Sequence, residues 1–265
     1  MSFSIVSSGD VPFISLDAFA ARGYLAAFST RRGGVSEDPF ASMNVGFSSG
    51  DLPENVIRNR QRLFGALGIE PTEVVVASQV HGNGVLRLTG EASGMGATSP
   101  GEGPGPADIL LTDVRRLFLF QVFADCVPIF LADSRRRAVA IAHAGWRGSA
   151  ADVAGTAVRA LGEAFGSAPG DLVAGIGPAI APPCYPVGPE VGEAITATYP
   201  WAGRYVKDGQ ADLRSLNAEA LLRLGIPAAA IHVAPWCTRC ETDLLFSYRR
   251  DGVRSGRMAG IVGIL

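Results

Sequence analysis

Basic charge, cysteine and histidine are all scarce in this 265-residue sequence, and each scarcity excludes a class of protein. The 23 Lys and Arg residues against 25 Asp and Glu leave a formal net charge of −2. No basic excess is therefore present to bind a nucleic-acid backbone or an anionic membrane. Four cysteines are too few for a disulfide-built scaffold. Three histidines are too few for a multicopper cluster held mostly by imidazoles.

Long apolar runs are missing as well. The most apolar stretch, residues 117–131, is interrupted by Gln121 and Asp125, so it falls short of the roughly 18 clean residues of a membrane-spanning helix. The first residues lack the basic and apolar regions of a secretory signal. We therefore expect a soluble, cytoplasmic protein whose thiols serve as core residues, metal ligands or catalytic groups.

Apolar residues are plentiful and evenly spread. They make up 48% of the chain, against 18% charged residues, which is enough to fill a sizeable core. No repeat and no linker divides the sequence, so we expect one domain spanning residues 1–265. The one long glycine- and proline-rich stretch, residues 90–106, predicts an exposed, mobile loop.

Short strand and helix patterns alternate along the chain. Hydrophobic periodicity predicts strands over residues 24–29, 74–77, 85–88, 109–112, 117–123, 129–131, 138–142, 172–176 and 231–234. Helices are predicted from a capping box at residues 51–54 to Gly68, from about Ser149 to Phe165, and over residues 191–198 and 213–224. This alternation predicts a layered α/β fold in which a mixed β-sheet is covered by helices.

Two of the three histidines and one cysteine directly follow apolar strands. His81 comes after the strand predicted at residues 74–77, Cys126 after 117–123, and His143 after 138–142. If these strands share one sheet and one direction, the three side chains converge at one edge, where open sheets commonly bind ligands. Two imidazoles and a thiolate form a three-ligand set for zinc, which leaves a fourth position for water or substrate.

The same residues fit other roles. Histidines at strand ends are often hydrogen-bonded core residues, and cysteine is often a small buried hydrophobe. A His₂Cys set with an axial methionine is that of a blue-copper site. Cys126 with His143 would also serve as nucleophile and base of a cysteine hydrolase, with Asp125 orienting the base.

A zinc nucleobase deaminase of the H-x-E, P-C-x-x-C type is excluded. No histidine in the chain is followed by glutamate two residues later, although residues 235–240 nearly match the second half of that motif. The pair Cys237-x-x-Cys240 lacks the second such pair of a structural zinc knuckle. A redox dithiol is the other interpretation of this pair.

Several motifs occur together in a characteristic order. They are Thr30–Ser36, Met43–Gly46, Ser78–Gly82, Ala124–Cys126, His143-Ala144-Gly145-Trp146-Arg147-Gly148, Gly177-Pro178 with Cys184-Tyr185, and Phe246–Arg250. Spanning about residues 30–257, they resemble the YfiH/laccase-domain family, formerly labelled polyphenol oxidases. Its members are described as purine nucleoside phosphorylases with adenosine deaminase activity. The sequence departs from the family pattern at Pro186, where an acidic residue is expected.

The resemblance implies a fold, a cofactor and partners. The fold is a layered α/β/α domain with a mixed sheet. The cofactor is zinc, with copper as the alternative metal, and its ligands are His81, Cys126 and His143. The partners are purine nucleosides and phosphate, without nucleic acid or membrane, and the protein is expected to be a monomer or small homo-oligomer. A cysteine hydrolase that edits cell-wall precursors and a copper-dependent polyphenol oxidase are the alternative functions.

The resemblance also suggests roles for residues near the triad. Asp125 would carry a proton or orient a ligand histidine. Arginine forks suit phosphate, and the candidates are Arg31, Arg147, Arg249 and Arg250. Asn44 and Gln79 would hydrogen-bond the base or ribose. Trp146 or Tyr248 would stack on a purine.

Overall fold

Two six-stranded sheets form the centre of the computed structural model, which describes residues 3–265. The first sheet has the order β1 (Phe3–Ser8), β2 (Val11–Leu16), β3 (Tyr24–Ser29), β14 (Met258–Ile264), β7 (Phe118–Phe123) and β4 (Val74–Val76). The second has the order β13 (Ile231–Val233), β10 (Leu172–Ile176), β8 (Val127–Asp133), β9 (Ala138–Ala144), β6 (Ile109–Thr112) and β5 (Val85–Arg87). Each sheet contains both parallel and antiparallel neighbours.

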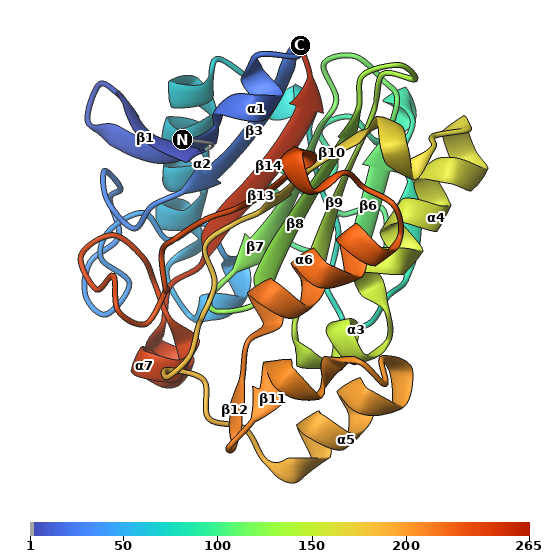
Figure 1. Cartoon of the computed structure of the whole chain (residues 1–265). Coiled ribbons are helices and arrows are strands. Elements are labelled where there is room, and N and C mark those ends of the chain that lie inside the picture. The colour runs from blue at the N-terminus through green and yellow to red at the C-terminus, as the bar shows by residue number, and fades with distance from the viewer. Residues whose placement is uncertain (1–2) are drawn as a thin grey trace.

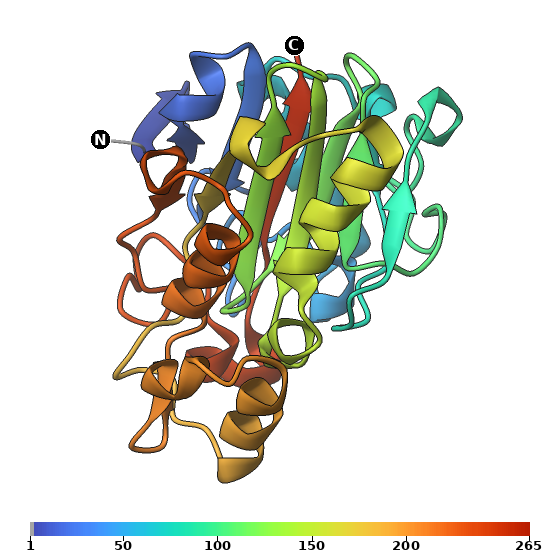
Figure 2. The same ribbon diagram turned by 45° about the vertical axis from the view of Figure 1, so that its right-hand side comes forward.

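Helices cover the outer faces of both sheets. In Figure 1, α2 (Pro53–Leu67) lies behind β3 and β14 of the first sheet, whereas α4 (Val153–Phe165) and α6 (Leu213–Arg223) lie in front of the second. Figure 2 shows α4 and α6 against the second sheet from another side. The remaining elements are short or peripheral: α1 (Asp17–Ala20), α3 (Trp146–Ala150), α5 (Pro189–Thr198), α7 (Tyr248–Asp251), and the pair β11 (Val206–Lys207) and β12 (Gln210–Ala211). The layers therefore run helix, sheet, sheet, helix.

Alternating side chains along the strands build this layering. On β7, Phe118 and Phe120 pack towards α2, while Leu119 and Phe123 point between the sheets. On β9 the alanines point towards α4, and Val139 and Ile141 point between the sheets. A strand alternates its faces with a period of two, so His143, two residues after Ile141, also points between the sheets.

The mixed α/β class is confirmed, and the strands are divided between two sheets rather than gathered in one. Strands β3, β6 and β10 have the predicted bounds. The strands that precede the triad do not share a sheet: β4 and β7 belong to the first and β9 to the second. Strands β1, β2 and β14 were not predicted. β14 lies in the middle of the first sheet, and its apolar run is interrupted by Gly260 and Gly263.

Two predicted helix starts need correction. The helix expected from Ser149 to Phe165 is broken between α3 and α4, because Asp152 adopts a left-handed backbone (φ 57°) and its carboxylate accepts a hydrogen bond from Gly155 N at 3.1 Å. At α2 no capping box forms, and Leu52 is the N-cap. The Asp51 carboxylate instead accepts hydrogen bonds from Ser36 and Asn44.

The glycine-rich stretch over residues 90–106 is not exposed throughout. Ala97 is buried in the cluster that α2 forms with the first sheet. Gly96 has a φ of +71°, and a Cβ there would stand 2.6 Å from the carbonyl oxygen of Val76. Glycine is required at this position because the loop backbone packs directly on β4. Among residues 3–265, no helix is long and apolar enough to cross a membrane.

Candidate active site

The structure brings the two histidines and the cysteine together. His81 lies in the loop after β4, Cys126 in the turn between β7 and β8, and His143 near the end of β9. Their ligand atoms all lie within 4.8 Å of one another. The two imidazole rings meet edge to face with centroids 4.8 Å apart. His143 is buried and His81 is exposed, so the cluster is open on one side only.

Asp108, which precedes β6, holds both histidines. Its Oδ1 accepts hydrogen bonds from His143 Nδ1 at 2.9 Å and His81 N at 3.0 Å, and its Oδ2 accepts from Val80 N at 3.1 Å and Gly82 N at 2.8 Å. These bonds stabilise the left-handed backbone of His81 (φ 61°), which is uncommon for a residue other than glycine. Because Nδ1 of His143 is bound to Asp108, Nε2 is left to face Cys126 or a metal ion.

Sequence reasoning did not find Asp108. The signal in the sequence is an acidic residue directly before the apolar run at the start of β6, and in the structure Asp108 is fully buried. A buried carboxylate is nearly always paired or hydrogen-bonded, so it points to a basic partner nearby.

Opposing effects set the protonation of the cluster. Burial raises the pKa of the Cys126 thiol, but His143 and His81 outweigh it and lower that pKa to about 6. Burial lowers the pKa of His143, but Cys126 and Asp108 outweigh it and raise that pKa to about 9. The thiolate is the form of cysteine that attacks electrophiles and binds metals. Near neutral pH, Cys126 is therefore ready for either role.

The affinity of this cluster for a divalent metal ion is expected to depend on pH. Between the Cys126 pKa of about 6 and the His143 pKa of about 9, a metal ion must displace the proton of His143, whereas Cys126 is already a thiolate. The apparent affinity should therefore rise about tenfold per pH unit in this window and level off above it. Below the Cys126 pKa of about 6, the apparent metal affinity should fall more steeply with decreasing pH, because Cys126 is protonated too. Chelator-competition titrations at several pH values measure this, and an affinity independent of pH would contradict it.

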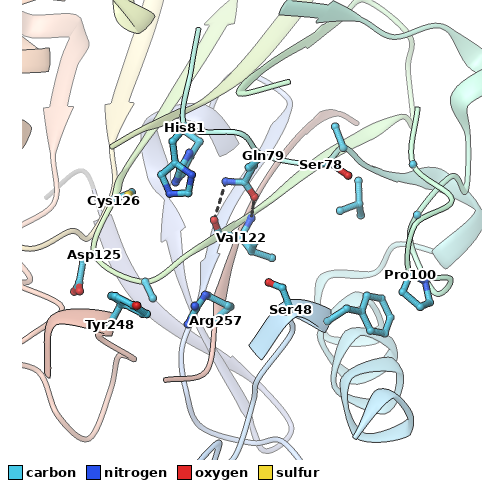
Figure 3. A pocket seen from close by; sticks show the side chains of 18 of the residues that line it. Ser48, Ser78, Gln79, His81, Pro100, Val122, Asp125, Cys126, Tyr248 and Arg257 are labelled. Atoms are coloured by element: carbon cyan, nitrogen blue, oxygen red, sulfur yellow. Dashed lines mark hydrogen bonds between the residues drawn. The ribbon is translucent and has the colours of Figure 1, made fainter. Parts of the chain in front are cut away.

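A cavity of about 720 Å³ opens beside the cluster (Figure 3). This volume is in the range of ligand-binding pockets, roughly 300–1,000 Å³. In Figure 3, His81, Cys126 and Asp125 lie at one end, Ser78 and Pro100 at the other, and Arg257 lies between Tyr248 and Ser48. The loop over residues 90–106 supplies one wall with Gly96, Ser99, Pro100, Gly101 and Gly103.

Two of the six residues expected to bind substrate line this cavity, Gln79 and Arg249. The Gln79 amide is paired with the Val122 backbone, donating to its carbonyl at 2.9 Å and accepting from its N–H at 2.8 Å (Figure 3). Arg249 donates through Nη1 to the carbonyl of Pro186 at 2.8 Å. Its guanidinium lies over the Tyr185 ring, 5.0 Å from the centroid.

The other four lie outside the cavity lining. Arg31 donates to the carbonyls of Ala41 and Thr242, and Arg250 donates to backbone carbonyls and pairs with Asp251. The Arg147 guanidinium lies over the Trp146 ring, 4.3 Å from its centroid. Fully buried Asn44 accepts hydrogen bonds from Gly46 N at 3.2 Å and Arg257 N at 2.9 Å, so it positions two residues of the cavity wall.

Asp125 lines the cavity next to Cys126, and within residues 3–265 its carboxylate forms no hydrogen bond with either histidine of the cluster. Its Oδ1 accepts from Thr238 Oγ1 and its Oδ2 from Arg249 N, both at 2.6 Å. The backbone at Asp125 is left-handed (φ 90°). The role of orienting a ligand histidine therefore falls to Asp108, whereas Asp125 joins the Cys126 turn to the chain segments of Thr238 and Arg249.

Two arginines of the cavity were not among the expected contacts. Arg60 is almost fully buried, and donates to the carbonyls of Val45, Gly96 and Ala97. Arg257 donates through Nη1 to the carbonyls of Ser255 and Gly256. Within residues 3–265 neither guanidinium forms an ion pair with a carboxylate, and Nε and Nη2 of Arg257 have no hydrogen-bond partner. This wall of the cavity is therefore positively charged and has free donors.

Comparison with known proteins matches nearly the whole chain to one family. Residues 25–265 match the family model described as multi-copper polyphenol oxidoreductase laccase. The protein named purine nucleoside phosphorylase YlmD of Geobacillus stearothermophilus is 38% identical over 249 residues, covering 91% of this chain and 90% of that protein. Purine nucleoside phosphorylase YfiH of Escherichia coli is 38% identical over 250 residues, covering 92% and 95%.

Solved structures agree with these relatives. The crystal structure of YlmD from Geobacillus stearothermophilus superposes with a TM-score of 0.90 at 37% identity, covering 95% of this chain and 96% of that one. A Bacillus licheniformis protein called YfiH superposes with a TM-score of 0.91 at 35% identity, covering 96% of each chain. The fold, the ordered motifs and the relatives agree, and the chain belongs to the YfiH-like laccase-domain family.

Proposed function

We propose that this protein is a zinc-dependent purine nucleoside phosphorylase that also deaminates adenosine. One observation supports this most directly: a single cavity holds the His81/Cys126/His143 cluster at one end and, in its wall, the guanidinium of Arg257 with two free donor atoms. Relatives about 38% identical are named purine nucleoside phosphorylases. Adenosine, inosine, guanosine and methylthioadenosine are the proposed substrates, which phosphate would convert to free base and ribose-1-phosphate.

The donor atoms of the cluster fit a zinc ion. They are two imidazole nitrogens and a thiolate sulfur within 4.8 Å of one another, and Asp108 orients one imidazole as carboxylates do at zinc sites. Zinc bound there would supply a Lewis acid with a position open to the cavity. A multicopper cluster does not fit, because the chain has three histidines and His232 lies on β13, outside the cluster.

Phosphate is the substrate that the arginines suit. In phosphorolysis a phosphate oxygen forms a bond to the anomeric carbon of ribose, and the bond from that carbon to the purine nitrogen breaks, with its electron pair leaving on the base. The phosphate must be held as an anion near the reacting carbon. Arg257 has two free donor atoms, and Arg249 also lines the cavity. Guanidinium groups bind such oxygens through paired hydrogen bonds.

Asp125 is the proposed proton carrier for the leaving base. Its carboxylate lies next to Cys126 and lines the cavity, and Thr238 and Arg249 fix its orientation. Tyr248, which is half exposed at the same end, is the aromatic ring proposed to stack on the purine.

The proposed enzyme is a single domain over residues 1–265. The hydrophobic core that the two sheets share supports this proposal.

A cysteine hydrolase is the second candidate, and one observation favours it. Cys126, His143 and Asp108 form a chain of thiol, imidazole and carboxylate, in which His143 and Asp108 are 2.9 Å apart. This is the arrangement of a nucleophile, a base and an orienting acid. A thioester trapped on Cys126 of an active, metal-free preparation would support it against the zinc enzyme.

The function is tested by incubating zinc-loaded protein with adenosine, with and without phosphate. We expect adenine and ribose-1-phosphate only when phosphate is present, and inosine in both cases. Inosine and guanosine should also yield base and ribose-1-phosphate. Absence of both reactions with every one of these nucleosides, in protein of verified zinc content, would overturn the proposal.

Replacing Arg257 by Gln should weaken phosphate binding specifically. Loss of charge-assisted hydrogen bonds of about 1.5–3 kcal/mol corresponds to roughly a 10- to 150-fold higher KM for phosphate. The KM for nucleoside and the phosphate-independent deamination should change far less. Arg254→Gln is the matched control, because Arg254 is exposed and lies outside the cavity lining. Equal phosphate kinetics in both variants would show that Arg257 does not bind phosphate.

A further inference from the structure

A second group of potential metal ligands, three thiols, lies outside the His81/Cys126/His143 cluster. Cys184 follows the turn at Pro182 and Pro183, and Cys237 and Cys240 lie on a turn after β13, more than fifty residues later. The Sγ atoms of Cys184 and Cys240 are 3.4 Å apart, and the three sulfurs all lie within 4.8 Å of one another. Folding therefore supplies the Cys237-x-x-Cys240 pair with a third sulfur that its sequence neighbourhood lacks.

The spacing of these sulfurs suits a shared metal ion. Zinc–sulfur bonds of about 2.3 Å in a tetrahedral site place two sulfurs about 3.8 Å apart, which falls between the observed 3.4 Å and the 4.8 Å limit. A disulfide would bring two sulfurs to about 2.05 Å. The turn itself is closed by hydrogen bonds from Cys240 N and Glu241 N to the Cys237 carbonyl, at 3.1 and 3.0 Å. Both of its cysteines are thereby presented to Cys184.

The charge around the three sulfurs also suits a bound divalent cation. Three thiolates around a divalent cation have a net charge of −1, and Arg239 Nη1 lies 3.6 Å from Cys184 Sγ. Cys184 is buried, Cys237 is half-buried and Cys240 is exposed. An ion held here would be enclosed by protein on one side and open to solvent at Cys240, which leaves room for a fourth, external ligand.

We propose that Cys184, Cys237 and Cys240 form a second metal site, which binds a soft thiophilic cation such as Zn²⁺ and joins the two chain segments. Thiolates select such ions over hard cations. The joined segments support the cavity: Tyr185 lines it next to Cys184, and Thr238, within the cysteine turn, holds Asp125 through a 2.6 Å hydrogen bond. Its proposed role is to hold these two segments together, and this role does not depend on the reaction proposed above.

The test is a zinc titration of the reduced, full-length protein, with bound metal measured after gel filtration in the presence of a weak chelator. We expect about two zinc ions per chain in the unaltered protein, about one in Cys240→Ser, about one in Cys126→Ser and none in the double variant. If only the second site exists, the unaltered protein and Cys126→Ser should each bind one ion and Cys240→Ser none. The two metal sites are thus tested separately.

Two further measurements address folding and the alternatives. In the Cys126→Ser variant, zinc should raise the melting temperature. It should not do so once Cys240 is also replaced. If Cys126→Ser does not fold, His81→Ala takes its place.

With cobalt, thiolate-to-metal absorption should fall by about three quarters in Cys240→Ser, since three of the four ligand thiolates belong to this site. The proposal is overturned if Cys240→Ser binds as much zinc as the unaltered protein, or if mass spectrometry finds a Cys184–Cys240 disulfide in place of bound metal.

Discussion

Replacing Cys126 by Ala should abolish stoichiometric metal binding at the His81/Cys126/His143 cluster and lower the rate of phosphorolysis by roughly 10³-fold or more. The variant retains two imidazoles and lacks the one anionic ligand of the cluster. A metal ion contributes several kcal/mol of transition-state stabilisation, and about 4 kcal/mol corresponds to about 10³-fold in rate. Metal content and kcat/KM for adenosine, measured on the same preparation, check this result.

His232→Ala is the matched control for this experiment. His232 lies on β13, outside both groups of metal-ligating residues. It should keep the metal content and rate of the unaltered protein. Full activity of Cys126→Ala without metal would refute both the zinc enzyme and the cysteine hydrolase, because each requires this sulfur.

Replacing Asp108 by Asn should have the largest combined effect on stability and metal binding. In the native protein, four donors bind the two carboxylate oxygens: three backbone N–H groups and His143 Nδ1. The amide of the variant keeps only one acceptor oxygen. Leaving two of these buried or part-buried donors unpaired costs about 3 kcal/mol of unfolding free energy. Loss of the partner of a metal-binding histidine lowers metal affinity about 10- to 100-fold. Denaturant unfolding of the metal-free protein and chelator competition measure the two effects.

Asp133→Asn separates this role from the general effect of changing a buried aspartate. Asp133 is also fully buried and accepts two backbone hydrogen bonds, from Arg135 and Arg136, but its Oδ2 has no partner. It lies at the end of β8 remote from Cys126. Its variant should lose no more than about 1 kcal/mol and keep the metal affinity of the unaltered protein. Equal metal affinity in both variants would show that Asp108 does not position the metal ligands.

The periodicity of the chain identified most central elements because burial on both faces requires continuous apolar strands. The apolar runs of β6 and β10 are too short for buried helices, so they predict strands. The capping box before α2 was mispredicted because the Asp51 carboxylate binds Ser36 and Asn44, which lie outside the local pattern. The break at Asp152 was missed although its signal is local, an aspartate N-cap bonded to Gly155 N, because apolar residues continue past it. The glycine-rich stretch was misjudged because its composition is typical of a free loop, whereas Ala97 within it packs into the cluster that α2 forms with the first sheet.

The sequence by itself determined the α/β class, the family and the three residues of the cluster, because strand periodicity and the ordered motifs are local properties of the chain. Only the tertiary structure decided which residues stand beside them. Asp108, Arg257 and Cys184 are far in sequence from the groups they contact or face, and stacking two sheets places them there. Alternation along a strand tells which side chains share a face, but not which face of another sheet they will meet.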